Sequence, residues 1–166
     1  MKELRASYPE MADHFLMVAQ GGVYPQATLV QTILGSCVAV TFHVPRYQMG
    51  AIFHGLLPAK ENYVGQADQD SHFRYVDSGV EHLFETLRSK GVKPSEMVCK
   101  VFGGSQALFS GEQCVGLRNV QAAYETLARL RLRVLVASVG GNRGRKVAFA
   151  THTGDVYVKV FRGPSS

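Results

Sequence analysis

Cys37 has the sequence context of a nucleophile, because it follows Gly35 and Ser36 directly and opens an apolar segment. A glycine at this point lets the chain turn sharply, and the backbone N–H groups of such a turn can stabilise the oxyanion of a substrate carbonyl. A free thiol is only slightly ionised at neutral pH, so the chemistry also needs a neighbouring base. A small buried thiol without a chemical role is the alternative that a lone Gly-Ser-Cys leaves open.

His54 is the candidate for that base. It lies in an apolar segment, residues 50–57, where an imidazole costs free energy to bury unless it is paired. A short turn at residues 45–50 separates this segment from the one after Cys37, so the two strands could pair as a hairpin and bring both side chains to one end. A core histidine bonded to a backbone carbonyl is the alternative, but the cysteine on the neighbouring strand favours the base.

Thr32 precedes the Gly-Ser-Cys turn and could supply a third group. Its hydroxyl could hold the far nitrogen of the histidine in the orientation that a general base needs. The alternative is an ordinary β-branched residue of a strand, which the composition of the segment also allows.

Two glycine pairs follow apolar segments and could border a substrate cleft. They are Gly103-Gly104 and Gly140-Gly141. Neither matches the phosphate-binding patterns GxxxxGK[ST] or GxGxxG, so tight turns beside a cleft are favoured over a phosphate cradle. A solvated basic loop is the alternative for the arginines that follow the second pair. The residues expected to support the substrate or its oxyanion are Gly35, Ser36, Gly103, Gly104, Asn142 and Arg143.

No metal is expected. The other histidines show no HExxH spacing, and the three cysteines are widely spaced and include no CxxC. Cys99 and Cys114 have no base beside them in the sequence and are interpreted as structural. A sparse, odd set of cysteines fits a reducing cytosol, so we expect a cytoplasmic protein.

Hydrophobic periodicity predicts a helix over residues 75–89 that ends before Gly91, and Asn119 is a candidate N-cap for a second helix. Residues 59–72 are polar and predict a long loop. Two helices are too few for a doubly wound nucleotide-binding fold, so the order of elements indicates a layered α/β sandwich with a mixed or antiparallel sheet. Strands are predicted at residues 29–42 with an interruption at Gly35-Ser36, and at 50–57, 97–102, 134–139 (of the buried type), 147–150 and 156–161 (a hairpin).

The 166 residues suit one domain spanning residues 1–166, with loose ends at residues 1–11 and 163–166. The net charge of +5 could indicate nucleic-acid binding, but no dense basic footprint supports it; a solvated face or a docking face for an acidic protein fits as well. No signal peptide is expected, and no stretch approaches the roughly 18 apolar residues of a membrane span. We therefore expect neither a nucleic-acid partner nor membrane insertion.

Several segments form an ordered pattern of motifs along the chain. Together they resemble the CheD family, the chemoreceptor glutamine deamidases of bacterial and archaeal chemotaxis, over roughly residues 28–160. The motifs are the Gly-Ser-Cys signature at residues 32–40, Phe53-His54-Gly55-Leu56-Leu57-Pro58, Lys100-Val101-Phe102-Gly103-Gly104, Gly116-Leu117-Arg118-Asn119, and the C-terminal pair at residues 140–147 and 153–159.

The resemblance implies an α/β sandwich that hydrolyses selected glutamine side-chain amides of chemoreceptors to glutamate, releasing ammonia through a thioester. It places the nucleophile of the family on Cys37, the base on His54 and the threonine on Thr32. It implies no cofactor. Chemoreceptors are the implied partners, and a CheC-type phosphatase of the response regulator is a further one, because some members of the family bind it.

Two other interpretations stay open. A regulatory binding module could act mainly by docking on a partner, but it would not need the pair of Cys37 and His54. Another cysteine hydrolase, such as a protease or a transglutaminase, could use the long polar segment at residues 59–72. The order of the motifs favours deamidation over this second alternative.

Overall fold

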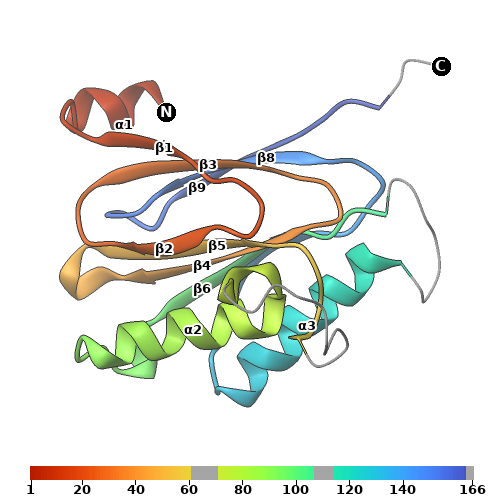
Figure 1. Ribbon diagram of the computed structural model, residues 1–166. Helices are drawn as coiled ribbons and strands as arrows, with labels where there is room; N and C mark the ends of the chain where they lie inside the picture. Colours follow the sequence, from red (N-terminus) through yellow and green to blue (C-terminus); the bar gives the residue numbers. More distant parts are fainter. Residues whose placement is uncertain (61–70, 107–113, 164–166) are drawn as a thin grey trace.

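The computed structural model describes residues 1–60, 71–106 and 114–163 (Figure 1). The loop predicted at residues 59–72 and the loose end predicted at residues 163–166 lie largely outside these ranges. Within the described ranges, no helix is both long enough and apolar enough to cross a membrane.

The chain forms three layers: a four-stranded sheet A, a five-stranded sheet B, and helices on the far side of sheet B (Figure 1). The predicted layered α/β sandwich is confirmed, with two sheets in place of one. In spatial order, sheet A consists of β1 (Ala12–Phe15), β3 (Thr28–Leu34), β8 (Arg145–Ala150) and β9 (Val156–Val160). Sheet B consists of β2 (Gly21–Tyr24), β5 (Met49–Gly55), β4 (Val38–Val44), β6 (Val98–Gly103) and β7 (Val134–Val139).

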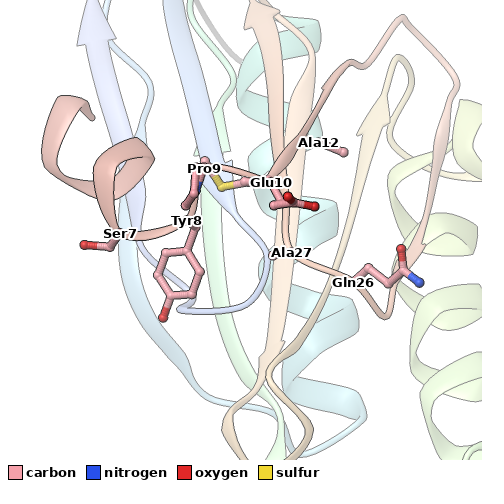
Figure 2. Close-up of a pocket in the computed structure, with 8 residues that line it drawn as sticks. Ser7, Tyr8, Pro9, Glu10, Ala12, Gln26 and Ala27 are labelled. Atoms are coloured by element: carbon pink, nitrogen blue, oxygen red, sulfur yellow. The ribbon is translucent and has the colours of Figure 1, made fainter.

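The N-terminal region, for which the sequence predicts a loose end, forms a short helix, α1 (Lys2–Ser7), followed by β1. Met11 is buried with Leu29 of β3 in a small apolar cluster. Residues 7–12, together with Gln26 and Ala27, line a cavity of about 300 Å³ beside α1 (Figure 2). Apolar contacts thus hold part of this region against sheet A.

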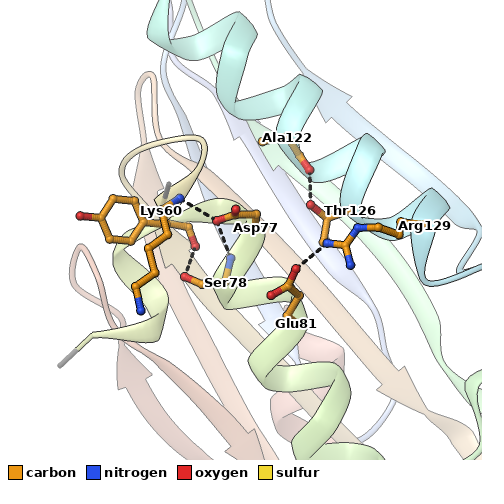
Figure 3. Close-up of polar contacts among 8 residues, drawn as sticks. Lys60, Asp77, Ser78, Glu81, Ala122, Thr126 and Arg129 are labelled. Atoms are coloured by element: carbon orange, nitrogen blue, oxygen red, sulfur yellow. Dashed lines mark hydrogen bonds and ion pairs between the residues drawn. The ribbon is translucent and has the colours of Figure 1, made fainter. Parts of the chain in front are cut away.

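Two long helices form the third layer. Helix α2 (Val76–Ser89) confirms the helix predicted at residues 75–89, and Gly91 follows its end with φ of +86°. Helix α3 (Val115–Arg129) lies beside it, and Arg129 forms an exposed ion pair with Glu81 of α2 (Figure 3). Exposed ion pairs contribute little to stability. Apolar side chains of both helices are buried together with side chains of sheet B in one core cluster. Single-turn helices lie at η1 (Pro45–Tyr47), η3 (His72–Arg74) and η4 (Pro94–Glu96).

The Gly-Ser-Cys turn is the place where the chain crosses from one sheet to the other. The predicted strand segment at residues 29–42 does form strands on both sides of its interruption, but β3 belongs to sheet A and β4 to sheet B. Strand β4 pairs antiparallel with β5, from Val38 opposite Gly55 to Val44 opposite Met49, which confirms the predicted hairpin. Cys37 therefore lies between the last residue of one sheet and the first residue of the other.

Strands β4 and β5 are buried on both faces, because sheet A covers one face and the helices cover the other. Phe53 belongs to the apolar core under the helices, and Ile52 belongs to the core between the two sheets. Side chains alternate along a strand, so His54 shares the face of Ile52 and points between the sheets. The fold itself thus removes the imidazole from solvent.

Two predictions about elements are wrong. Strand β7 has the predicted bounds but is not of the buried type. Among the described strands it pairs with β6 alone, at the edge of sheet B, and Leu135 is 66% exposed and Val136 is 47% exposed. Asn119 is not an N-cap, because α3 begins at Val115 and Asn119 lies inside the helix. Local composition cannot distinguish an edge strand from a central one, since neighbours in a sheet come from distant parts of the chain.

Gly79 of α2 provides a test of the packing beneath His54. A Cβ atom there would overlap the ring of Phe53, which is fully buried and has little room to move. Alanine adds up to about 1 kcal/mol of helix propensity. We nevertheless expect Gly79→Ala to lower the free energy of unfolding by about 1–3 kcal/mol through overpacking. Gly22→Ala is the control for urea denaturation, because a Cβ atom at Gly22 meets no atom. Equal effects of the two substitutions would contradict this packing.

Candidate active site

Cys37 is half-buried and packs against the apolar core between the sheets. Its carbonyl accepts a hydrogen bond of 2.8 Å from the backbone N–H of Gly104. Desolvation by burial raises the pKa of the Cys37 thiol above its ordinary value of 9.0, and the opposing hydrogen bond from its own backbone N–H is the weaker effect. The thiol is therefore protonated at neutral pH, and its own N–H lies beside the sulfur.

His54 lies on the strand next to Cys37 and on the same face. The register places His54 opposite Ala39, two residues after Cys37. Residues two apart share a face, so Cys37 and His54 occupy diagonal positions, whose side chains are typically about 7–8 Å apart at the backbone and within reach of each other. The register thus places the predicted nucleophile and the predicted base at diagonal positions on the same side of the β4–β5 hairpin.

Thr32 reaches His54 from the opposite sheet. Its Oγ1 donates a hydrogen bond of 2.8 Å to the carbonyl of Leu16, and it lies 2.8 Å from Nδ1 of His54. A hydroxyl has a single hydrogen, which the carbonyl already uses, so Nδ1 must carry the proton and donate to Oγ1. This leaves the lone pair of His54 on Nε2, the tautomer in which that nitrogen can accept a proton.

His54 is 3% exposed, and its burial sets its charge. Desolvation lowers the pKa of His54 from 6.5 to about 4, so the imidazole is neutral at pH 7. Its Nε2 is buried and makes no hydrogen bond to any described residue. A neutral imidazole with a free lone pair, diagonally across the hairpin from a protonated thiol, can take the thiol proton as the sulfur attacks a carbonyl.

The first glycine pair is in direct contact with the Gly-Ser-Cys turn. Gly103 has φ of +108°, and a Cβ atom there would overlap the carbonyl of Cys37. The N–H of Gly104 donates to that carbonyl, and the N–H of Ser105 donates to the carbonyl of Gly35 at 2.9 Å. Glycine is required because the loop has to come this close to the backbone of Cys37.

The second glycine pair extends the same network. The N–H of Gly140 donates to the carbonyl of Gly103 at 2.9 Å, and the N–H of Gln106 donates to the carbonyl of Gly141 at 2.7 Å. Asn142 and Arg143 follow on the exposed part of this turn, and no hydrogen bond joins their side chains to Cys37 or His54. The structure therefore connects the glycines to the turn of Cys37 but leaves these two predicted residues at the surface.

Two further buried polar side chains hold these loops. Arg145 of β8 is 4% exposed and donates to the hydroxyl of Ser138 and to the carbonyl of Gly140. Asn119 is fully buried and donates to the carbonyl of Ser36, which precedes Cys37, and to the carbonyl of Leu56, which follows the strand of His54. The one sequence signal for a role of Asn119 in the site is its place in the Gly-x-Arg-Asn motif. The interpretation of Asn119 as a helix cap does not use this signal.

The cavity in Figure 2 is not part of this arrangement. It lies at the start of β3, beside Gln26 and Ala27, whereas the Gly-Ser-Cys turn follows the other end of that strand. It contains neither the thiol nor a histidine. Among the described residues, no three His, Cys, Asp or Glu side chains lie close enough to one another to hold a metal ion.

Comparisons with known proteins match the chain to one family. A family model described as CheD chemotactic sensory transduction matches residues 56–160. This match begins after Cys37 and His54, so relatives aligned over more of the chain add to it. The probable chemoreceptor glutamine deamidase CheD 2 of Geobacter sulfurreducens is 39% identical over 158 residues, covering 94% of each chain.

Other relatives carry related names. The probable chemoreceptor glutamine deamidase CheD of Maridesulfovibrio salexigens is 40% identical over 145 residues, covering 83% of this chain and 84% of the relative. The chemoreceptor glutamine deamidase CheD of Thermotoga maritima is 34% identical over 130 residues, covering 78% of this chain and 80% of the relative. The similarity thus extends over most of each protein.

The three cysteines allow one experiment to test the accessibility and charge of Cys37. We expect iodoacetamide to label only Cys37 in the folded protein, because Cys99 and Cys114 are buried and burial raises the pKa of Cys99 to about 12. Because the pKa of Cys37 is raised, its labelling rate should still increase above pH 9. Peptide mass spectrometry at a series of pH values measures this, with Cys37→Ser as the unlabelled control. A rate that reaches a plateau below pH 8 would overturn the neutral-thiol assignment.

The buried imidazole makes stability depend on pH. Between pH 6.5 and about 4 the unfolded chain binds a proton at His54 that the folded protein does not bind, so stability falls as the pH falls through this range. We expect the free energy of unfolding to decrease by roughly 1–2 kcal/mol more in the wild type than in His54→Gln between pH 7.5 and 5. Urea denaturation at both pH values measures the difference. The contributions of the other histidines cancel, because both proteins contain them. Equal losses in the two proteins would show that His54 titrates normally.

Proposed function

The chain belongs to the CheD family, and from this premise we propose that it is a chemoreceptor glutamine deamidase. Such an enzyme hydrolyses glutamine side-chain amides of chemoreceptors to glutamate and releases ammonia. The single observation that carries the assignment of the site is the hydrogen bond between Thr32 and His54, because it leaves the lone pair of the imidazole on Nε2. The names of the relatives support the substrate.

The first half of the reaction forms a thioester. His54 Nε2 accepts the proton of the Cys37 thiol while the sulfur attacks the amide carbon of the glutamine. The bond between sulfur and carbon forms and gives a tetrahedral oxyanion. His54 then donates the proton to the departing nitrogen, the bond between carbon and nitrogen breaks, and ammonia leaves.

The second half returns the enzyme to its starting state. His54 removes a proton from water, and the oxygen of that water attacks the thioester carbon. The bond between carbon and sulfur breaks, the receptor leaves with a glutamate side chain, and His54 returns the proton to the sulfur of Cys37. Thr32 holds the imidazole through Nδ1 in both halves, so Nε2 is the nitrogen that exchanges protons each time.

The backbone N–H of Cys37 is the proposed donor to the oxyanion. It lies beside the sulfur, and within the described residues no backbone carbonyl accepts a hydrogen bond from it. A donor that already points at the reacting centre stabilises developing negative charge without having to reorient. Gly35, Ser36, Gly103 and Gly104 support this group by fixing the turn around it.

The proposal includes partners and a location. Receptor cytoplasmic domains are the proposed substrate, and the cytoplasm is the proposed location. A CheC-type phosphatase is a further proposed partner on the basis of the family resemblance. A purely regulatory binding module is the competing function, and it would have no use for a neutral imidazole held in one tautomer beside a thiol.

The test is conversion of receptor glutamine to glutamate, mapped by mass spectrometry after incubation with receptor cytoplasmic domains. We expect no conversion with Cys37→Ala, because no nucleophile is left, and a rate at least about a hundredfold lower with His54→Ala, because the base is lost. Cys114→Ala and His14→Ala are matched controls. Cys114 makes no side-chain cap bond and His14 is exposed, so both variants should keep the wild-type rate.

Two outcomes would count against the enzyme. Absence of conversion by the wild type would leave the binding module as the better interpretation. Unchanged conversion by Cys37→Ala would exclude the thioester.

A further inference from the structure

Asn119 makes contact with both parts of the candidate active site. Its Nδ2 donates to the carbonyl of Ser36 at 2.9 Å and to the carbonyl of Leu56 at 3.0 Å. Both partners are acceptors only, so the nitrogen of the amide, and not its oxygen, must face them. One NH₂ group thus joins the residue before Cys37 to a residue two positions after His54.

The bond to Ser36 determines where the N–H of Cys37 points. The Ser36 carbonyl and the Cys37 N–H belong to the same peptide plane, and in a trans peptide they point in opposite directions. Asn119 holds the carbonyl on the α3 side of this plane. The N–H is therefore held pointing away from α3, beside the sulfur, where it can donate to an oxyanion.

The bond to Leu56 continues the pairing of β4 and β5 beyond its last backbone pair. That pair is Val38 with Gly55, so Cys37 and Leu56 have left the ladder. The side chain of Asn119 joins the two strand ends where the backbone no longer does. It thereby limits how far the turn that carries the nucleophile can move from the strand that carries His54.

Helix α3 is held firmly enough to act as the support for this amide. A Cβ atom at Gly116, one turn before Asn119, would overlap the carbonyl of Ser105 and lie 2.8 Å from that of Gly104. The helix therefore rests directly on the backbone of the first glycine pair. Asn119 projects from a surface that is already in contact with the site.

The amide of Asn119 is only partly satisfied in its buried position. The side chain is fully buried, and its Oδ1 has no hydrogen-bond partner among the described residues. An unsatisfied buried acceptor costs about 1–3 kcal/mol. Asn is also a weaker helix former than Leu by a few tenths of a kcal/mol. Asn119 thus supplies a donor to two carbonyls and leaves its own acceptor without a partner among the described residues.

We infer that Asn119 is a positioning residue: it orients the Ser36–Cys37 peptide so that the Cys37 N–H stabilises the oxyanion, and it holds this turn against the strand of His54. The inference rests on the proposed function for its biological meaning. Its chemistry can be tested without a receptor, because any acyl transfer to Cys37 passes through an oxyanion, whereas alkylation does not.

The test compares two reactions of Cys37 in the full chain. With p-nitrophenyl acetate the sulfur bonds to the acetyl carbon, p-nitrophenolate leaves, and His54 takes the thiol proton. With iodoacetamide the sulfur displaces iodide from a saturated carbon, and no oxyanion forms. The variants are Asn119→Leu, which keeps the volume and removes both hydrogen bonds, and Asn119→Ser, which is milder if the leucine variant does not fold.

Thr126→Val is the matched control. Thr126 is a second buried polar residue of α3, and its Oγ1 donates to the carbonyl of Ala122 at 2.7 Å, away from the site (Figure 3). Circular dichroism and thermal melts identify which variants are folded. The control should keep the acylation and alkylation rates of the wild type even where its melting temperature falls.

We expect Asn119→Leu and Asn119→Ser to lower the acylation rate about tenfold to a hundredfold, with the alkylation rate within about threefold of wild type. Unchanged acylation in a folded Asn119 variant would overturn the inference. An equal fall in both reactions would also overturn it, because that result indicates a lost or buried thiol and not a misdirected N–H.

Receptor deamidation separates this inference from the proposed function. On the receptor, the Asn119 variants should lower kcat by the same factor as acylation and leave KM unchanged. If the wild type acylates as expected but does not deamidate receptors, the proposed function fails and the positioning role stands. If the wild type deamidates and the Asn119 variants keep its kcat, the positioning role fails and the function stands.

Discussion

Burial of a neutral imidazole between two sheets is the constraint on which the rest of this site depends. An imidazole in this position loses its hydration, so its neutral form is strongly favoured and its ring nitrogens need partners. Thr32 supplies one partner from the opposite sheet, and the carbonyl of Leu16 determines the direction in which the hydroxyl can donate. The same contact that satisfies a buried polar atom thereby decides which nitrogen of His54 can accept a proton.

The crossover between the sheets explains why the nucleophile lies where it does. A turn between two sheets belongs to neither hydrogen-bonded ladder, so its peptide groups need other partners and can be directed toward chemistry. Here the partners are the backbone of residues 103–105 and the amide of Asn119. Glycine at positions 103 and 104 allows that approach, and Arg145 holds the next loop in turn. The site is thus a set of loops fixed to one another as well as to the sheets.

Most elements could be predicted from the sequence, and the errors have a common cause. The helix at residues 75–89 and the hairpin at the C-terminus follow from local periodicity and turn residues, and both are present. The bounds of strand β7 follow from its composition but its exposure does not, because β7 lies at the edge of sheet B and has β6 as its one neighbour among the described strands. Asn119 was assigned to a helix end because asparagine favours caps, whereas its partners are carbonyls 83 and 63 residues away in the chain.

The sequence by itself determined the chemical groups: a cysteine after a glycine turn, a histidine on an apolar strand next to it, and a threonine before the turn. These are local facts, and the short connection between β4 and β5 made the pairing of Cys37 with His54 derivable. Only the tertiary structure decided that Thr32 faces His54 from another sheet, that the imidazole is neutral, and that Asn119 links the two strand ends. Burial and contacts between sheets depend on how segments that are far apart in the sequence pack together. No local pattern of residues determines that packing.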